Sequence, residues 1–377
     1  MATITYLTKV QFDFGALGLL AEELRLLGIS RPLIVTDGGI VAAGLFDRVK
    51  AELPDPAAAA LFDGTPENPT EEAMDAALEA WREAGCDGVI GLGGGSSMDL
   101  AKAVALMATH PGNLADYMAI LGGAPKITAK IAPVVAIPTT AGTGSEVGRG
   151  AVMILKDGRK LALLSPHLLP RVSICDPELT LGLPPRLTAG TGMDAFAHNF
   201  ETFCAPAVNP PADAIALDGF TRVVRHIERA VADGSDREAR WQMMMGAMEG
   251  AMAFQKGLGA VHGMSHPLGS LKQLRLHHGT LNAVCLPTVI RYNAGHVGDR
   301  YERLKQAWGL PASADLAEAV AALNTRLGLP ASLREMGVDE AMIEPLVPAA
   351  VADHTTATNP RPLDADDYRR LFLETLG

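Results

Sequence analysis

The chain has 377 residues, of which 48% are hydrophobic and 20% are charged, and its formal net charge is −11. This composition is typical of a globular protein, and the length predicts two domains, or three at most. The acidic balance argues against a protein that coats nucleic acid, because phosphate binding requires a basic face. Aromatic residues make up only 5%, which also disfavours a platform for stacking bases. A soluble globular enzyme is the class that remains.

The cysteines and the N-terminus bear on the compartment. An even number of cysteines allows disulfides, but scattered single cysteines without a CxxC pair are more typical of buried thiols. The first residues lack a basic segment followed by an apolar one, so we expect no signal peptide. No stretch reaches the ~18 uninterrupted apolar residues of a membrane span. We therefore expect a cytoplasmic protein with these four cysteines reduced: Cys86, Cys175, Cys204 and Cys285.

Short apolar runs alternate with helical patterns over about the first 180 residues. Continuous apolar strands between helices indicate a parallel sheet that is covered on both faces. The expected strands are Pro32–Thr36, Ala58–Phe62, Asp87–Leu92 and Val134–Ile137. The expected helices run to about Glu52, over Thr70–Ala84, and from Ser97 to about Thr109.

The pattern changes near residues 181–186 (LGLPPR), where two prolines interrupt the chain. Beyond them, apolar residues recur at helical spacing and strand patterns are almost absent. Helical patterns cover Pro210–Arg229, Asp236–Gly257 and Ala314–Leu327. The sequence therefore predicts an α/β domain over residues 1–184 and an all-α domain over residues 185–377.

Two turns rich in small residues follow strands in the first domain. Residues 93–99 (GGGSSMD) lead into a helix, where glycines let the backbone approach a phosphate and the helix N-terminus supplies N–H donors. The GxGxxG pattern is not kept, and a tight turn with Ser96 or Ser97 as helix cap is the alternative. Residues 138–146 (PTTAGTGSE) follow the strand at 134–137 and give a polar lining at its carboxyl end. Together the two turns indicate a dinucleotide site at this edge of the sheet.

Asp37 stands directly after the strand at 32–36. There, its carboxylate could accept hydrogen bonds from an adenosine ribose and would repel a 2′-phosphate, which favours NAD over NADP. The segment 37–39 (DGG) is also a good turn, so a purely structural role is the alternative.

The second domain contains a set of histidines and one aspartate at helical spacing. Asp194 and His198 are four residues apart, which places them on one helical face, about 6 Å apart along the axis. His262 and His266 repeat this spacing, and residues 277–279 (HHG) follow after a loop. Imidazoles with a carboxylate suit Fe²⁺, Zn²⁺, Mn²⁺ or Co²⁺, and the absence of cysteine in the set argues against structural zinc. A single such histidine is more often a core or helix-end residue, but the set indicates a catalytic metal.

In this order of motifs the sequence resembles the iron-containing, group III alcohol dehydrogenase family, over about residues 30–295. The resemblance implies a dehydroquinate-synthase-like fold, with an α/β nucleotide-binding domain built on a parallel sheet and an all-α metal-binding domain. The matching segments are GGGSSMDLAK at 93–102, PTTAGTGSEV at 138–147, LLPRVSICDPELTLGLP at 168–184, TAGTGMDAFAHNFE at 188–201 and HGMSHPLG at 262–269.

The resemblance also implies the metal ligands. They are Asp194, His198, His262 and the histidine that precedes Gly279. The segment before that glycine looks about two residues longer than the family pattern and ends in two histidines, so His278 is expected and His277 is the alternative.

Further roles follow from the same resemblance. His266 is implied to lie near the nicotinamide and the substrate as the catalytic candidate, without ligating the metal, and Phe254 is implied to line the substrate pocket. The cofactor contacts implied are Asp37, Asn68, Gly94, Gly95, Ser96, Asp99, Thr139, Thr140, Thr143 and Lys160.

The implied activity is the reversible oxidation of an alcohol to an aldehyde or ketone. NAD⁺ would accept the hydride, and a divalent metal, Fe²⁺ ahead of Zn²⁺, would polarise the alcohol oxygen. We expect a homodimer or larger homo-oligomer with no nucleic-acid or membrane partner. The alternatives are an NAD- and metal-dependent lyase of the dehydroquinate-synthase type and a maleylacetate-reductase-like reductase. The lyase would need a basic pocket for a phosphate, whereas residues near the candidate ligands are mainly apolar or small.

Overall fold

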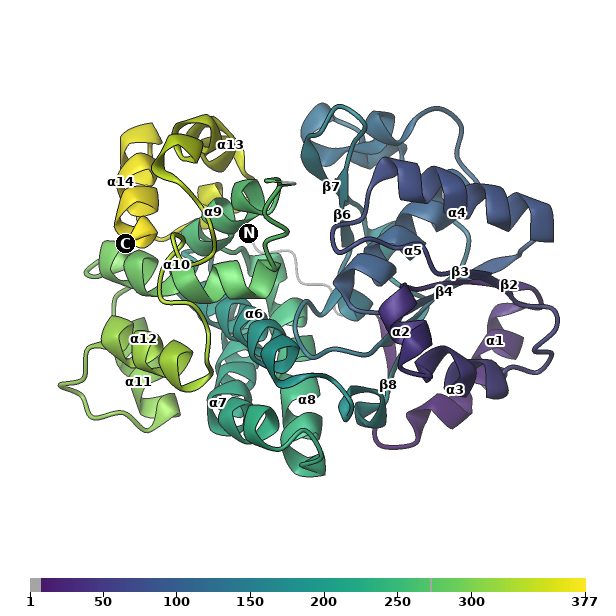
Figure 1. The fold of residues 1–377 in the computed structure, drawn as a ribbon, viewed down its shortest axis with the longest axis horizontal. Coiled ribbons are helices and arrows are strands. Elements are labelled where there is room, and N and C mark those ends of the chain that lie inside the picture. The colour runs from purple at the N-terminus through teal and green to yellow at the C-terminus, as the bar shows by residue number, and fades with distance from the viewer. Residues whose placement is uncertain (1–7, 272) are drawn as a thin grey trace. The chain divides into compact units, whose positions relative to one another are not determined.

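A computed structural model describes residues 8–271 and 273–377. The described chain divides into two compact units, each of which is considered by itself (Figure 1). The sheet unit comprises residues 8–140 and 144–182, and the helical unit comprises residues 141–143 and the described residues from 183 to 377. In neither unit is any described helix long and apolar enough to cross a membrane.

The sheet unit is built on six strands in the order β1-β8-β5-β4-β2-β3, and every neighbouring pair is parallel. A separate antiparallel hairpin is formed by β6 and β7. The predicted parallel sheet is confirmed. The strands are β1 (Lys9–Phe12), β2 (Pro32–Val35), β3 (Ala60–Phe62), β4 (Gly88–Gly93), β5 (Val134–Pro138), β6 (Gly150–Ile154), β7 (Lys160–Leu164) and β8 (Val172–Cys175).

Helices cover both faces of this sheet, because successive strand residues point to opposite sides. Leu33 and Val35 of β2 lie in one core with residues of α4 and α5, whereas Ile34 lies in a second core with residues of α1 and α3. All four residues of β2 are buried as a result. The helices of this unit are α1 (Leu20–Leu27), α2 (Gly38–Ala42), α3 (Leu45–Ala51), α4 (Glu71–Ala84) and α5 (Gly95–Met107).

The described part of the helical unit contains no strand, as the sequence predicts. Its longest helices, α6, α7 and α8, pack against one another, and α10 packs against α6, α9 and α12 (Figure 1). The helices are α6 (Pro185–Cys204), α7 (Pro210–Ala232), α8 (Arg237–Ala253), α9 (Ala260–Leu268), α10 (His278–Asn293), α11 (Arg300–Trp308), α12 (Leu316–Arg326), α13 (Val347–Ala352) and α14 (Ala365–Leu376).

Four strands are additional to those expected from the sequence. Among the described strands β1 (KVQF) pairs with β8 alone, and it begins with the exposed Lys9 and contains a glutamine, so it forms no continuous apolar run. β8 (VSIC) contains Ser173, whose buried hydroxyl donates to the carbonyl oxygen of Glu146. The β6–β7 hairpin was detectable, since its turn contains Asp157 followed by Gly158, a common hairpin signal.

A buried lysine of α5 holds the loop that leads into β6. The Lys102 ammonium is fully buried and lies 2.7 Å from the carbonyl oxygen of Ser145, 3.0 Å from that of Gly148 and 2.8 Å from that of Gly150. Burial lowers the pKa of Lys102 to about 8, although Asp99 and Glu146 oppose the shift. The side chain therefore satisfies several carbonyl groups that water does not reach.

Replacing this lysine by methionine should destabilise the sheet unit strongly. Lys102→Met keeps a long apolar side chain but leaves the loop carbonyls without a donor and Asp99 without its cationic neighbour. We expect a loss of about 3–5 kcal/mol in the free energy of unfolding, measured with urea. Lys156→Met is the control, because Lys156 pairs with Asp75 at the surface and should cost less than about 1 kcal/mol. Equal losses in the two variants would contradict this role of Lys102.

Candidate metal centre

Helix α6 presents three ionisable side chains on one face. Asp194, His198 and Glu201 are separated by four and three residues, so they follow one another along the same side of the helix. All three are at least 95% buried, because α6 lies among α7, α8 and α10. Charged groups in such an interior require polar partners nearby.

Helix α10 brings the fourth candidate ligand to α6 through a close backbone contact. A Cβ atom on Gly279 would lie 2.0 Å from the carbonyl oxygen of Gly190, so only glycine allows this approach. His278, the first residue of α10, thereby lies beside Asp194. His277 instead forms the N-cap of α10, where its Nδ1 accepts a hydrogen bond from the backbone N–H of Thr280.

Three imidazole nitrogens surround one oxygen of the aspartate. Oδ1 of Asp194 lies 3.7 Å from Nε2 of His198, 3.7 Å from Nε2 of His262 and 3.5 Å from Nε2 of His278. Ligands held about 2.1 Å from a tetrahedral ion are themselves ~3.4 Å apart. The spacing and the chemistry of this donor set therefore fit a divalent transition-metal ion.

Electrostatics agree with a cation site. Burial by itself would raise the pKa of Asp194, but the surrounding imidazoles hold it well below its usual range. Burial lowers the pKa of His198 to about 4, so this imidazole is neutral and its lone pair is available. Burial opposes protonation of His262 too, yet Asp194 and Glu201 raise its pKa to about 9. The interior between the two carboxylates thus favours positive charge.

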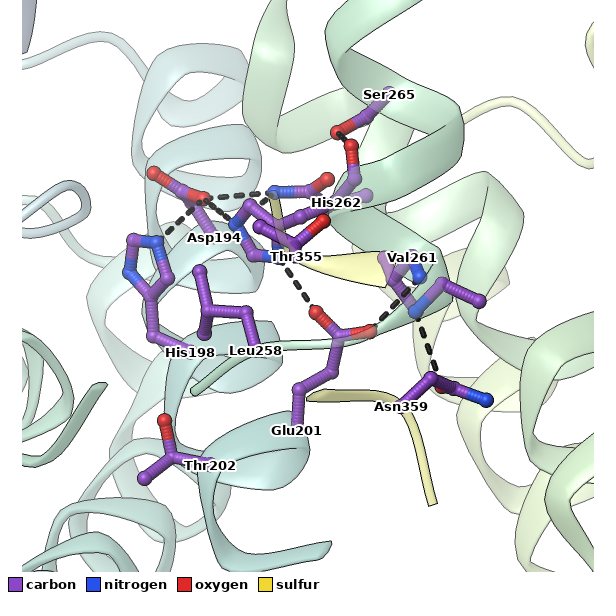
Figure 2. A network of polar contacts seen from close by, with 12 residues as sticks. Asp194, His198, Glu201, Thr202, Leu258, Val261, His262, Ser265, Thr355 and Asn359 are labelled. Atoms are coloured by element: carbon purple, nitrogen blue, oxygen red, sulfur yellow. Dashed lines mark hydrogen bonds and ion pairs between the residues drawn. The ribbon is translucent and has the colours of Figure 1, made fainter. Parts of the chain in front are cut away.

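Glu201 contacts the ring nitrogen of His262 that faces away from Asp194 (Figure 2). Its Oε2 lies 2.6 Å from Nδ1 of His262, and its Oε1 accepts the backbone N–H of Val261 at 2.8 Å. With Nδ1 donating to Glu201, Nε2, the nitrogen near Asp194, is the one that would lose its proton to a metal ion and then offer a lone pair. Carboxylates of this kind fix the tautomer and the ring orientation of metal-ligating histidines.

Asn282 is a further member of the centre that the sequence reasoning missed. Its amide nitrogen donates to Oδ1 of Asp194 at 2.8 Å and lies 3.3 Å from Nε2 of both His262 and His278. Its position one turn after His278, like that of Glu201 two turns after Asp194, was the available signal. Polar residues at those spacings are common, so the signal alone does not select them.

His266 and Phe254 lie next to this donor set. The His266 ring stacks on that of His278 with 5.4 Å between centroids, and its Nδ1 lies 2.8 Å from Oδ2 of Asp353. Phe254, in a short 3₁₀ helix (Phe254–Lys256), meets the ring of His198 edge-on at 5.3 Å. Asp353 was not anticipated from the sequence, because it is 87 residues away along the chain.

The two small-residue turns of the sheet unit are neighbours. β4 and β5 pair so that Gly93 is opposite Pro138, and both turns therefore begin at the same edge of the sheet. A Cβ atom on Gly94, the N-cap of α5, would lie 3.5 Å from the hydroxyl oxygen of Thr140. Asp37 caps α2 by accepting two backbone N–H groups, and its other oxygen is 3.5 Å from the Ser97 hydroxyl.

The other residues expected to bind cofactor have varied surroundings. Thr139 has a buried hydroxyl with no hydrogen-bond partner among the described residues, and Lys160 donates to the side chain of Asn68 at 2.8 Å. The hydroxyl of Ser96 donates to the carbonyl oxygen of Glu67, next to Gly95 at the start of α5. Asp99 accepts from Ser145 and from the backbone of Val152, and Thr143 belongs to the segment grouped with the helical unit.

Comparison with known proteins gives the same assignment for both units. A family model described as iron-containing alcohol dehydrogenase matches residues 8–177, and a model of the C-terminal part of the Fe-containing alcohol dehydrogenase family matches residues 188–376. The chain belongs to the iron-containing alcohol dehydrogenase family. The sequence-based recognition of this family and its fold is confirmed.

Relatives match over the whole chain. A 4-hydroxybutyrate dehydrogenase from Cupriavidus necator is 56% identical over 383 aligned positions, which cover all of both proteins. A 1,3-propanediol dehydrogenase from Citrobacter freundii is 36% identical, with 96% of each chain covered.

Solved structures of family members also superpose over the full length. A 1,3-propanediol oxidoreductase has a TM-score of 0.92 at 33% identity, with both chains fully covered. A sulfoacetaldehyde reductase from Bifidobacterium kashiwanohense in complex with NAD⁺ has a TM-score of 0.89 at 28% identity, with 100% of this chain and 98% of that chain covered.

The predicted activity is thereby confirmed at the level of the family. The chain is a metal-dependent oxidoreductase that transfers hydride between an alcohol, or its aldehyde or ketone, and NAD(H). Neither the lyase nor the maleylacetate-reductase alternative is supported by these matches.

Removing the carboxylate behind His262 should weaken metal binding without touching a ligand. In Glu201→Ala, His262 loses the acceptor for Nδ1 and is free to rotate or change tautomer. We expect the affinity for Fe²⁺ or Zn²⁺ to fall about 10–100-fold, measured by competition with a chromophoric chelator. Glu201→Gln keeps one acceptor oxygen, and its metal affinity should lie between those of the wild type and Glu201→Ala. Glu238→Ala, at an exposed position of α8, is the control and should bind metal as the wild type does. Wild-type affinity in Glu201→Ala would contradict the orienting role.

Proposed function

We propose that the physiological substrate is 4-hydroxybutyrate, oxidised with NAD⁺ to the aldehyde acid 4-oxobutanoate and formed from it in reverse. The observation that supports this substrate is the 56% identity, over the whole of both chains, to a 4-hydroxybutyrate dehydrogenase. Other relatives act on 1,3-propanediol or lactaldehyde at 34–36% identity, so the match to the hydroxy acid enzyme is much the stronger.

We infer that Asp194, His198, His262 and His278 hold the divalent ion, with Fe²⁺ ahead of Zn²⁺. When bound there, the ion supplies Lewis acidity toward the alcohol oxygen. Asp194 contributes the only negative charge among the four donors, and Glu201 keeps His262 in the tautomer that ligation requires. Asn282 supports the same arrangement by donating to Asp194.

His266 is the proposed catalytic residue beside these donors. Because its Nδ1 is engaged by Asp353, Nε2 is the nitrogen left to contact substrate and to accept or return a proton. Phe254 supplies an apolar surface against His198, which keeps water away from that side of the donor set.

For NAD we propose the edge of the sheet where the two turns meet. The N–H groups of Gly94, Gly95 and Ser96 at the start of α5 suit the pyrophosphate, and Asp37 favours a ribose without a 2′-phosphate. The remaining contacts proposed are Asn68, Asp99, Thr139, Thr140, Thr143 and Lys160. In this assignment residues 1–184 bind the nucleotide and residues 185–377 hold the metal.

A substrate panel tests the assignment. NADH formation would be followed for the Fe²⁺-loaded enzyme with 4-hydroxybutyrate, 1,3-propanediol and ethanol, each with NAD⁺ and with NADP⁺. We expect the highest kcat/KM with 4-hydroxybutyrate and NAD⁺, by about tenfold or more, since binding of a carboxylate contributes differential affinity. His198→Ala is the control and should lose both the metal and turnover. Faster turnover of 1,3-propanediol would reject the hydroxy acid as substrate.

Asp353 should affect the rate through His266. Asp353→Ala removes the acceptor for Nδ1, and we expect kcat to fall about 10–100-fold with little change in KM or metal content. Asp353→Asn keeps an acceptor oxygen and should restore a large part of kcat. Steady-state kinetics with metal analysis of each variant measure this, and a rise in KM at constant kcat would instead indicate a role in binding alone.

Two expectations concern the whole molecule. We infer a cytoplasmic enzyme that forms a homodimer or a larger homo-oligomer, as in the family. Light scattering after size-exclusion chromatography and fractionation of the source cells would test them.

A further inference from the structure

A second group of metal-ligating side chains lies beside the centre described above. His266, Asp353 and His354 each offer one donor atom, and these atoms lie within 4.8 Å of one another. Nδ1 of His266 is 2.8 Å from Oδ2 of Asp353, and Nδ1 of His354 is 3.5 Å from Oδ1. Two imidazoles therefore present the same ring nitrogen to the two oxygens of one carboxylate.

Hydrogen bonds and ring stacking hold the side chains of this group in place. Oδ1 of Asp353 accepts the backbone N–H of Thr355 at 2.9 Å and its hydroxyl at 2.7 Å, which fixes the carboxylate at the end of α13. The rings of His266 and His354 stack with 5.9 Å between centroids and only 16° between planes. His266 belongs to α9, so the imidazole and the carboxylate both project from ordered backbone.

The second group is open to solvent through His354. The side chain of His354 is 52% exposed, whereas those of His266 and Asp353 are 17% and 13% exposed and that of His278, in the first donor set, is 27% exposed. An ion can therefore reach the group from solvent at His354.

We propose that His266, Asp353 and His354 form a second divalent-metal site that takes a borderline cation such as Zn²⁺. Two imidazoles and one carboxylate are the donors of many transition-metal sites and leave coordination positions for water. Ca²⁺ and Mg²⁺ are disfavoured, because they require mainly oxygen ligands and the group offers one carboxylate.

The second site has its own donor atoms, but an ion bound there would affect the catalytic residue beside the first site. It shares no ligand with Asp194, His198, His262 and His278, and each set contains its own carboxylate. The His266 ring is nevertheless only 5.4 Å from that of His278. Zn²⁺ on Nδ1 of His266 replaces the proton that this nitrogen donates to Asp353. When the second site is occupied, His266 therefore loses its hydrogen bond to Asp353 and no longer serves in proton transfer. Excess zinc should for this reason inhibit the enzyme reversibly.

Zinc binding to the Fe²⁺-loaded enzyme tests the site. The holoenzyme would be titrated with Zn²⁺ by calorimetry under anaerobic conditions, with iron and zinc counted by mass spectrometry after desalting. We expect the wild type to take up a zinc equivalent while keeping its iron. His354→Ala should lose this uptake and keep the iron, and it should resist inhibition by added zinc. His296→Ala, at another exposed histidine, is the matched control and should behave as the wild type does.

Three results would overturn the proposal. They are no zinc uptake by the wild type, zinc uptake matched by an equal loss of iron, and undiminished uptake by His354→Ala. The binding measurement needs no substrate, so its outcome is independent of whether 4-hydroxybutyrate is the physiological one.

Discussion

The buried carboxylate of Asp194 is the constraint on which the helical unit depends. An anionic group that is 98% shielded from water is stable only with charged or hydrogen-bonding partners, and removing a single partner is costly. Those partners come from three helices, namely His198 on α6 itself, His262 on α9 and His278 on α10. The packing of α6 against α10 therefore also brings the donor side chains together.

In the sheet unit the candidate ligand-binding groups belong mainly to the main chain and not to charged side chains. Because Gly93 is opposite Pro138, two loops rich in glycine and in hydroxyl side chains begin side by side. The buried Lys102 ammonium donates its hydrogen bonds to loop carbonyl groups, so it is not placed to contact a ligand. In the proposed site, the backbone N–H groups and the helix N-terminus would hold an anionic dinucleotide although the net charge of the protein is −11.

Local patterns predicted β2, β3, β4 and β5, several of the helices and the candidate ligands, because all of these depend on spacing within one segment. The apolar run at β5 and the four-residue spacings of Asp194 with His198 and of His262 with His266 are of this kind. Contacts between distant segments were not predictable in this way. Asp353 reaches His266 across 87 residues, and β8 joins the sheet between β1 and β5 although it contains a serine. Tertiary packing decides such contacts, and no single-segment pattern encodes them.

The contact between Gly190 and Gly279 has a consequence for how the donor set can adjust. A Cβ atom on Gly279 would lie 2.0 Å from the carbonyl oxygen of Gly190, so α6 and α10 already meet through main-chain atoms at this point. Side chains in a packed interior adjust by small rotations, whereas two touching backbones cannot approach further. Asp194 and His278 can therefore come closer together only by rotation of their side chains, and not by a movement of one helix toward the other.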